Sequence, residues 1–225
     1  MNRMPTALVA LTALACNLSD AAAQDGDKVA DLIAKVKMGD TKAAYTLGEM
    51  GPKAKEAIPA LIAAMQKMPM PGESLPDNAA LALGKIGADA VPPLIDMLKD
   101  MKTEKAWQYA ATALKVMGPA AKEAVPVLVE VAKGSKDPLA PLLAVDALGA
   151  IGPAAKGAVP TLVDLLRRNK LPPPNGRTHL VVALGKIGPD AQEAVKSLNE
   201  VREKADPVLR LHIDEALEQI AKKAK

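Results

Sequence analysis

Charged side chains recur in this chain at a regular spacing that could build a binding surface. Four apolar segments carry an acid at the same position, and the first three of them carry a base three residues later. The acids are Asp96, Glu130, Asp164 and Glu200, and the bases are Lys99, Lys133 and Arg167. If these segments stack as equivalent helices, an acidic column runs beside a basic column.

Two interpretations of these columns stay open. An acid and a base three residues apart on one helix can pair and stabilise that helix by about 0.2–0.5 kcal/mol. Alternatively, the acids form a ladder on the concave face of the stack and receive a basic or polar peptide. A DNA-binding stack would instead show one basic column with aromatic or arginine insertions. With a formal net charge of only +3, the pattern predicts a protein or peptide partner and no nucleic acid.

Two other groups of residues could ligate a metal, and neither forms a complete ligand set. His179 and His212 occupy matching positions in adjacent repeats, with Asp214 as the only obvious third ligand. Helix axes pack about 8–10 Å apart, so a shared metal would also need favourable rotamers. The pattern M-x-x-M-x-M at residues 65–70 suits thioether copper sites, but methionine is also a common gap-filler in helical cores. We expect no metal and no other cofactor.

The sequence carries no signature of nucleophilic catalysis. It has no glycine-rich phosphate loop and no serine-centred elbow, and neither histidine lies in a triad signature. The glycines stand instead where helices are expected to end. We therefore predict that the protein is not an enzyme.

A repeated sequence motif, A-L-G-x-I-G, predicts the helices that must position these residues. Its copies end at Gly51, Gly87, Gly118, Gly152 and Gly188, which are 36, 31, 34 and 36 residues apart. A leucine four residues before each glycine, and Ile or Met one residue before it, form the apolar stripe of an amphipathic helix. The glycine ends that helix by entering the left-handed conformation. A period in this range indicates a stacked solenoid.

A second apolar segment follows each copy and predicts a second helix. Its proline, at Pro59, Pro92, Pro126 and Pro160, fits the first turn of a helix. Breaker-rich loops separate the units, so we predict hairpins at about 42–67, 78–101, 104–133, 138–169 and 178–204. A capping helix at 27–38 and an unpaired terminal helix at 207–222 would cover the two ends of the array, as solenoids require.

The extended phrase A-L-G-x-I-G-P-x-A-x-x-A-V-P-x-L resembles HEAT repeats, specifically the short HEAT-like units also found in phycobilin lyase subunits. The resemblance covers residues 42–225. It implies an all-α, right-handed α-solenoid of stacked helical hairpins, with the first helices outside and the second helices lining the concave face. It also implies a non-catalytic scaffold that binds a protein or peptide. The alternative is a phycobilin-lyase-like enzyme or lyase subunit.

Residues 1–23 have the layout of a secretory signal peptide. A basic start at Arg3 precedes a short apolar run and a small-residue cleavage site at residues 21–23. Cleavage there would leave residues 24–225 as a HEAT-like repeat domain exported to the periplasm or the cell exterior. Cys16, the only cysteine, follows a poor lipobox, so lipid anchoring to a membrane is the weaker alternative. We expect the mature chain to be a monomer.

Overall fold

The computed structural model describes residues 25–67, 74–100, 106–134, 137, 139–172 and 175–222, and all regular secondary structure in these ranges is helical. The predicted signal peptide, Cys16, Met68 and Met70 lie outside the described residues. The first helices, which end at the repeated glycine, are α2 (Thr41–Met50), α4 (Leu75–Ile86), α6 (Ala106–Met117), α8 (Ala140–Ile151) and α10 (Gly176–Ile187). The second helices are α3 (Ile58–Gln66), α5 (Val91–Lys99), α7 (Val125–Lys133), α9 (Val159–Arg168) and α11 (Ala194–Arg202).

Further helices lie at the ends and corners of the array. Residues 25–37 are helical before α2, and α12 (Pro207–Ala221) follows α11. Asp206 caps α12 by accepting hydrogen bonds from the backbone amides of Val208 and Leu209, each at 2.9 Å. Each first helix is joined to the next second helix by a short 3₁₀ segment: η1 (Gly51–Ala57), η2 (Ala88–Ala90), η3 (Gly118–Ala124), η4 (Gly152–Ala158) and η5 (Gly188–Ala191).

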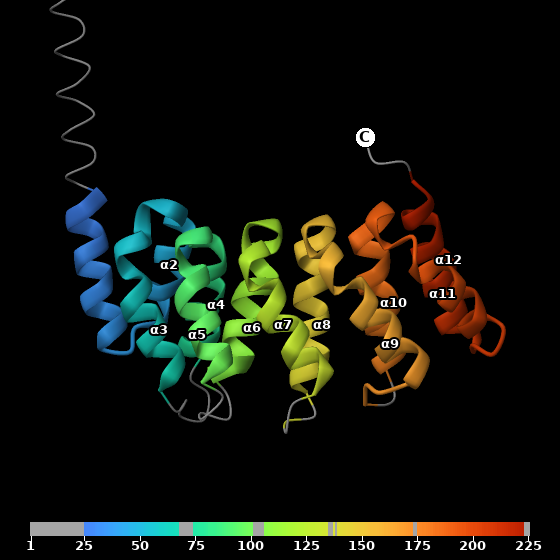
Figure 1. The fold of residues 1–225 in the computed structure, drawn as a ribbon. Coiled ribbons are helices and arrows are strands. Elements are labelled where there is room, and N and C mark those ends of the chain that lie inside the picture. The colour runs from blue at the N-terminus through green and yellow to red at the C-terminus, as the bar shows by residue number, and fades with distance from the viewer. Residues whose placement is uncertain are drawn as a thin grey trace, which may run out of the picture.

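The helices stack in chain order into an elongated, two-layered array (Figure 1). The 3₁₀ corners lie along the upper edge in this view, and the described ends of the inter-repeat loops lie along the lower edge. Each first helix packs against the first helices of its neighbouring repeats, from α2·α4 to α8·α10, and α10 packs in the same way on α12. The prediction of an all-α solenoid is confirmed.

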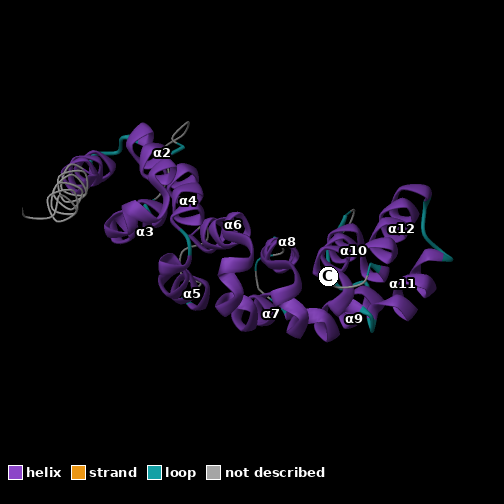
Figure 2. Ribbon diagram, turned by 90° about the horizontal axis from the view of Figure 1, so that it is seen from above, coloured by secondary structure: helices purple, strands orange, loops and turns teal. Residues whose placement is uncertain are grey.

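The curvature of the array corrects the predicted placement of the two layers. Seen from above, α4, α6, α8 and α10 lie on the inner side of the curve, and α5, α7, α9 and α11 lie on the outer side (Figure 2). Neighbouring first helices make much closer contact than neighbouring second helices. The layer with the shorter helix separations must form the inside of a curved stack. The first helices therefore line the concave face, and the expectation that the second helices do so is wrong.

Glycines within the first helices make this close approach possible. Gly149 of α8 lies so near α10 that an added Cβ atom would sit 2.9 Å from the Cα atom of Ala183. Gly48 is in similar contact with Ala82 of α4, and Gly185 with Ala216 of α12. Small residues thus let consecutive first helices pack almost backbone to backbone, while the second helices spread apart.

The pairing of helices also differs from the predicted hairpins. The extensive contacts within a two-helix unit join each second helix to the first helix that follows it: α3 to α4, α5 to α6, α7 to α8 and α9 to α10. Helices on either side of a 3₁₀ corner, such as α8 and α9, touch little. The terminal helix α12 likewise packs on α11 and is not unpaired. The individual helices lie close to the predicted ranges. The two helices that pack as a hairpin, however, are those joined by an inter-repeat loop, and not those joined by a 3₁₀ corner.

The repeated corner has a backbone conformation that only glycine adopts readily. Gly188 has φ +73° and ψ −139°, and Gly152 has φ +69° and ψ −138°. These angles lie outside the left-handed helical region, where ψ is about +47°. They lie near a region at positive φ and strongly negative ψ that is essentially confined to glycine. The glycines do end the first helices, but in this conformation and not in the left-handed helical one.

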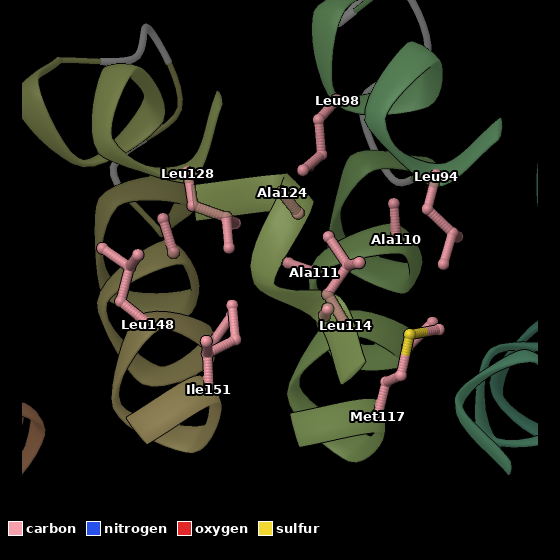
Figure 3. Close-up of a cluster of buried hydrophobic side chains, with 14 of the residues drawn as sticks. Leu94, Leu98, Ala110, Ala111, Leu114, Met117, Ala124, Leu128, Leu148 and Ile151 are labelled. Carbon is pink, nitrogen blue, oxygen red and sulfur yellow. The ribbon is translucent and has the colours of Figure 1, made fainter. Parts of the chain in front are cut away.

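The core lies between the two layers and consists almost entirely of Leu, Ile, Val, Met and Ala side chains. Figure 3 shows its centre, where Leu94 and Leu98 of α5 face α6, and Leu128 of α7 lies beside Leu148 of α8. Leu114 and Leu148, the recurring leucines of the repeated phrase, have no exposed surface. The predicted apolar stripe is confirmed at these positions.

One stretch of the described residues, Ala140–Arg168, is long and apolar enough to cross a membrane. It consists of α8, η4 and α9, so the chain turns at the Gly152 corner and no single straight helix runs through it. Many of its apolar side chains, including Leu148 and Leu162, are buried in the core. Its composition is therefore explained by the packing of the central repeats.

Candidate functional site

The charged columns predicted from the sequence lie on the convex side of the array. All seven residues are exposed, and they belong to α5, α7, α9 and α11, the outer layer of Figure 2. The residues are Asp96, Lys99, Glu130, Lys133, Asp164, Arg167 and Glu200. Their predicted position on the concave face is wrong, because the second helices form the outside of the curve.

The columns pair within and between helices. Glu130 and Lys133 form an i,i+3 pair at 2.7 Å, as the first interpretation of the pattern expects. Asp164 pairs instead with Arg168, at 2.7 Å, and Arg167 reaches across to Glu200 of α11 at 3.5 Å. All of these side chains are about half exposed or more. Such exposed pairs contribute about 0.2–1 kcal/mol each, so they mainly describe a solvated outer surface.

A polar network that the sequence did not predict crosses three consecutive first helices. Asp146 of α8 accepts a hydrogen bond from the Nζ atom of Lys115 on α6, at 2.8 Å. The second carboxylate oxygen of Asp146 lies 2.6 Å from Nδ1 of His179 on α10. Lys115 stands where the neighbouring repeats have glycine at Gly84 and Gly149. That departure from the repeat was the one sequence signal for a special role.

The Asp146 carboxylate is the centre of this network and is largely shielded from water. Its side chain is 19% exposed, whereas that of Lys115 is 45% exposed. Burial by itself raises the pKa of Asp146, but hydrogen bonds from Lys115 and His179, with their positive charges, outweigh it and hold that pKa below its usual range. A small cavity of about 60 Å³ lies against the network and is also lined by Lys186. The arrangement links α6, α8 and α10 through the Asp146 carboxylate.

The Asp146 network should make stability depend on pH. Because its pKa is lower in the folded than in the unfolded chain, the contribution is complete above about pH 5 and is lost as the pH falls through the folded-state pKa. We expect Asp146→Asn to lower the free energy of unfolding by about 1–3 kcal/mol at pH 7. The difference from the wild type should shrink at pH 3. Urea unfolding of both proteins at the two pH values measures this.

Asp164→Asn is the matched control for that measurement. It removes an exposed carboxylate paired with Arg168 on the convex side, and it should cost no more than about 1 kcal/mol at pH 7. An equal loss for Asp146→Asn at both pH values would show that the charge of Asp146 does not carry the effect.

The concave layer near the N-terminal end has a second cross-helix contact. Lys85 of α4 pairs with Glu49 of α2, and its Nζ atom lies 5.3 Å from the centroid of the Tyr45 ring. Hydrogen bonding to Lys85, together with its charge, lowers the pKa of Glu49. The Tyr45 side chain remains available, since the residue is 54% exposed.

Exposed apolar side chains adjoin this contact. Leu81 of α4 is 40% exposed and Val116 of α6 is 42% exposed. Because α4 packs on α2, α3 and α6, its exposed side can only face the hollow of the array. Val116 lies directly against α4, within 2.6 Å of where a Cβ atom on Gly84 would be. Tyr45, Leu81 and Val116, which we call the concave apolar patch, thus lie on three neighbouring helices.

The histidine pair does not form a common site. His179 contacts Asp146, whereas His212 on α12 lies 3.4 Å from Glu215 of its own helix. Asp214, the candidate third ligand, is instead bound by Arg202. Within the described ranges, no group of three or more His, Cys, Asp or Glu side chains is arranged to hold a metal ion.

Comparison with known proteins agrees with this architecture. A family profile of HEAT repeats matches residues 91–173 and 125–218, which together cover more than half of the chain. A profile of the PBS lyase HEAT-like repeat matches residues 41–67 and 76–100, the N-terminal repeats. No curated protein matches the chain. The profile matches follow the observed helices from α2 into α12, and the chain belongs to the HEAT repeat family.

Proposed function

We propose that this protein is a non-catalytic scaffold that binds a protein or peptide partner on its concave face. HEAT repeats typically mediate protein interactions. The observation that carries the proposal is the concave apolar patch, in which Tyr45, Leu81 and Val116 are exposed on adjacent helices. Exposed apolar groups that cluster beside polar ones are typical of protein-binding surfaces.

The polar contacts around the patch support the same role. The Lys85–Glu49 pair and the Asp146 network each tie neighbouring first helices together. Side chains held in this way lose little further freedom when a partner binds, which lowers the entropic cost of association. The partner that fits is a segment with apolar side chains for the patch and polar groups for the Asp146 network.

Two charge-changing variants test this assignment. Mature protein with Leu81→Glu and Val116→Glu should lose capture of its partner from an extract of the native envelope, because each change places a carboxylate in the patch. A convex variant with Glu130→Lys and Asp164→Lys should capture the same partner as the wild type. Circular dichroism checks that both variants keep their helices. Loss of capture by the convex variant alone would place the binding surface on the second helices.

A lyase-like role is the second candidate, and the PBS lyase HEAT-like matches at residues 41–67 and 76–100 favour it. Such a role predicts saturable or covalent transfer of colour when the mature protein is mixed with a bilin. An absorbance titration measures this. Binding of bilin that survives denaturation would support the lyase role over the scaffold.

We also propose that the protein is exported. The support is the order of Arg3, an apolar run and the alanines at 21–23, which is the layout of a cleavable signal peptide. N-terminal sequencing of the mature protein should therefore begin at Gln24. A mature chain that begins at a lipid-modified Cys16 would replace this proposal with membrane anchoring, and an intact Met1 would contradict export.

A further inference from the structure

A positively charged cavity lies between helix ends in the C-terminal part of the array, on other helices than the concave apolar patch. These helix ends are at the lower edge of the array in Figure 1. The cavity forms where α9 ends, α10 begins and α11 ends. Its volume is about 310 Å³, and its lining residues are Arg167, Arg177, Glu200, Val201 and Lys204. A water occupies about 30 Å³ in the liquid. The cavity therefore has room for an oxyanion that carries a small organic group.

Arg177 is the unusual member of this lining. Its Nε atom is buried, and no hydrogen-bond acceptor among the described residues satisfies it. Buried polar groups almost always have a partner, because an unsatisfied donor costs about 1–3 kcal/mol. Arg177 also lines a neighbouring cavity of about 540 Å³, where Oδ1 of Asp206 accepts the two hydrogen bonds that cap α12. The Nε–H group of Arg177 thus lacks the acceptor that its burial calls for.

The charges around the cavity favour an anion. Arg167, Arg177 and Lys204 supply three positive charges, and Glu200 supplies one negative charge. Glu200 lies 3.5 Å from Arg167 and so offsets that residue. Neither Arg177 nor Lys204 has an ion pair within the described part of the chain. The net charge of these four lining side chains, +2, matches a phosphate monoester, which carries about −1.5 to −2 charge near pH 7.

We propose that this cavity binds the phosphate group of a small molecule. Arg177 donates to the phosphate oxygens from its planar guanidinium, the geometry that suits oxyanions best. Lys204 reaches the same oxygens from the end of α11 as a mobile point charge, and Arg167 closes the site from α9. Because three consecutive helices contribute, the bound phosphate also ties the last two repeats together. The site is independent of the concave patch and of the partner proposed for it.

Titration of the mature protein with inorganic phosphate, glycerol 3-phosphate and acetate tests the proposal. The Nε–H signal of Arg177 in a ¹H–¹⁵N spectrum should shift and saturate with both phosphates, and acetate should bind more weakly. Tighter binding of glycerol 3-phosphate would identify an organic phosphate as the ligand. Equal affinity for the two phosphates would identify the free anion.

Variants assign the binding to these residues. Isothermal titration calorimetry measures the affinity of each variant, since Arg177→Gln removes the Nε–H signal. Arg177→Gln should weaken phosphate binding by about 10- to 100-fold, the range for hydrogen bonds to a charged group. Lys204→Gln, at an exposed position that should not affect folding, should also weaken it. Lys122→Gln removes the same charge from an exposed position on η3, at the opposite edge, and should change the affinity less than twofold. No saturable phosphate shift at Arg177, or equal losses in all three variants, would overturn the proposal.

Discussion

Replacing Leu148 by alanine is expected to lower the free energy of unfolding by about 2–5 kcal/mol. Leu148 has no exposed surface and lies in the centre of the array, beside Leu128 of α7 (Figure 3). The loss combines the smaller buried apolar area with the cavity that rigid neighbours cannot close. Leu114→Ala, one repeat earlier and equally buried, should cost a similar amount. Urea unfolding followed by circular dichroism gives the values.

Lys99→Ala is the control for the leucine variants. Lys99 is exposed on α5, so its loss should change the free energy of unfolding by no more than about 0.5 kcal/mol. Because solenoid repeats contact mainly their neighbours, the leucine variants should destabilise the central repeats first. Equal effects at Leu148 and Lys99 would mean that the buried and exposed faces of the helices are misassigned.

Replacing Gly188 by alanine is expected to cost about 1–3 kcal/mol through the backbone alone. Gly188 has φ +73° and ψ −139°, where a side chain is strained. An added Cβ atom would meet no other atom within 4 Å, so steric contact with neighbouring helices does not contribute. The midpoint of urea unfolding, compared with the wild type, measures the cost.

Gly157→Ala separates the backbone effect from the general effect of the substitution. Gly157 lies in η4 at an ordinary backbone angle, and its added Cβ atom would also lie in open space. Alanine there should leave stability unchanged or raise it by about 0.4–1 kcal/mol, because it restricts the unfolded chain. If Gly188→Ala were as stable as Gly157→Ala, the corner would not depend on the unusual conformation.

The helices and the core positions could be predicted from the sequence. The spacing of Leu114 and Leu148 to the repeated glycine predicts that they lie in the core, and both are fully buried. Pro126 and Pro160 were expected in the first turn of the second helices, and they lie there in α7 and α9. These features depend on contacts within a few residues and on apolar periodicity, both of which the sequence contains directly.

Which helices pack together, and which layer of helices lines the concave face, could not be predicted in the same way. Local periodicity shows which side of each helix is buried, but not whether α8 packs more closely on α7 or on α9. It also leaves open which layer lies inside the curve. That choice depends on the helix separations in the two layers, which are set by contacts such as Gly149 with Ala183 in the next repeat.

The candidate binding surfaces also combine features that the sequence predicts with features that only the tertiary structure shows. The repeat spacing predicts a column of acids that includes Glu130 and Asp164 on the concave face. Both residues are exposed on the second helices, but the curvature puts these helices on the convex side. Lys115, Asp146 and His179 come from three repeats, and each stands at a different distance from the repeated glycine of its own repeat. The sequence by itself determined a HEAT-like array and its core, because both repeat along the chain. Only the tertiary structure decided which side chains meet in the hollow, because that depends on how neighbouring repeats are staggered.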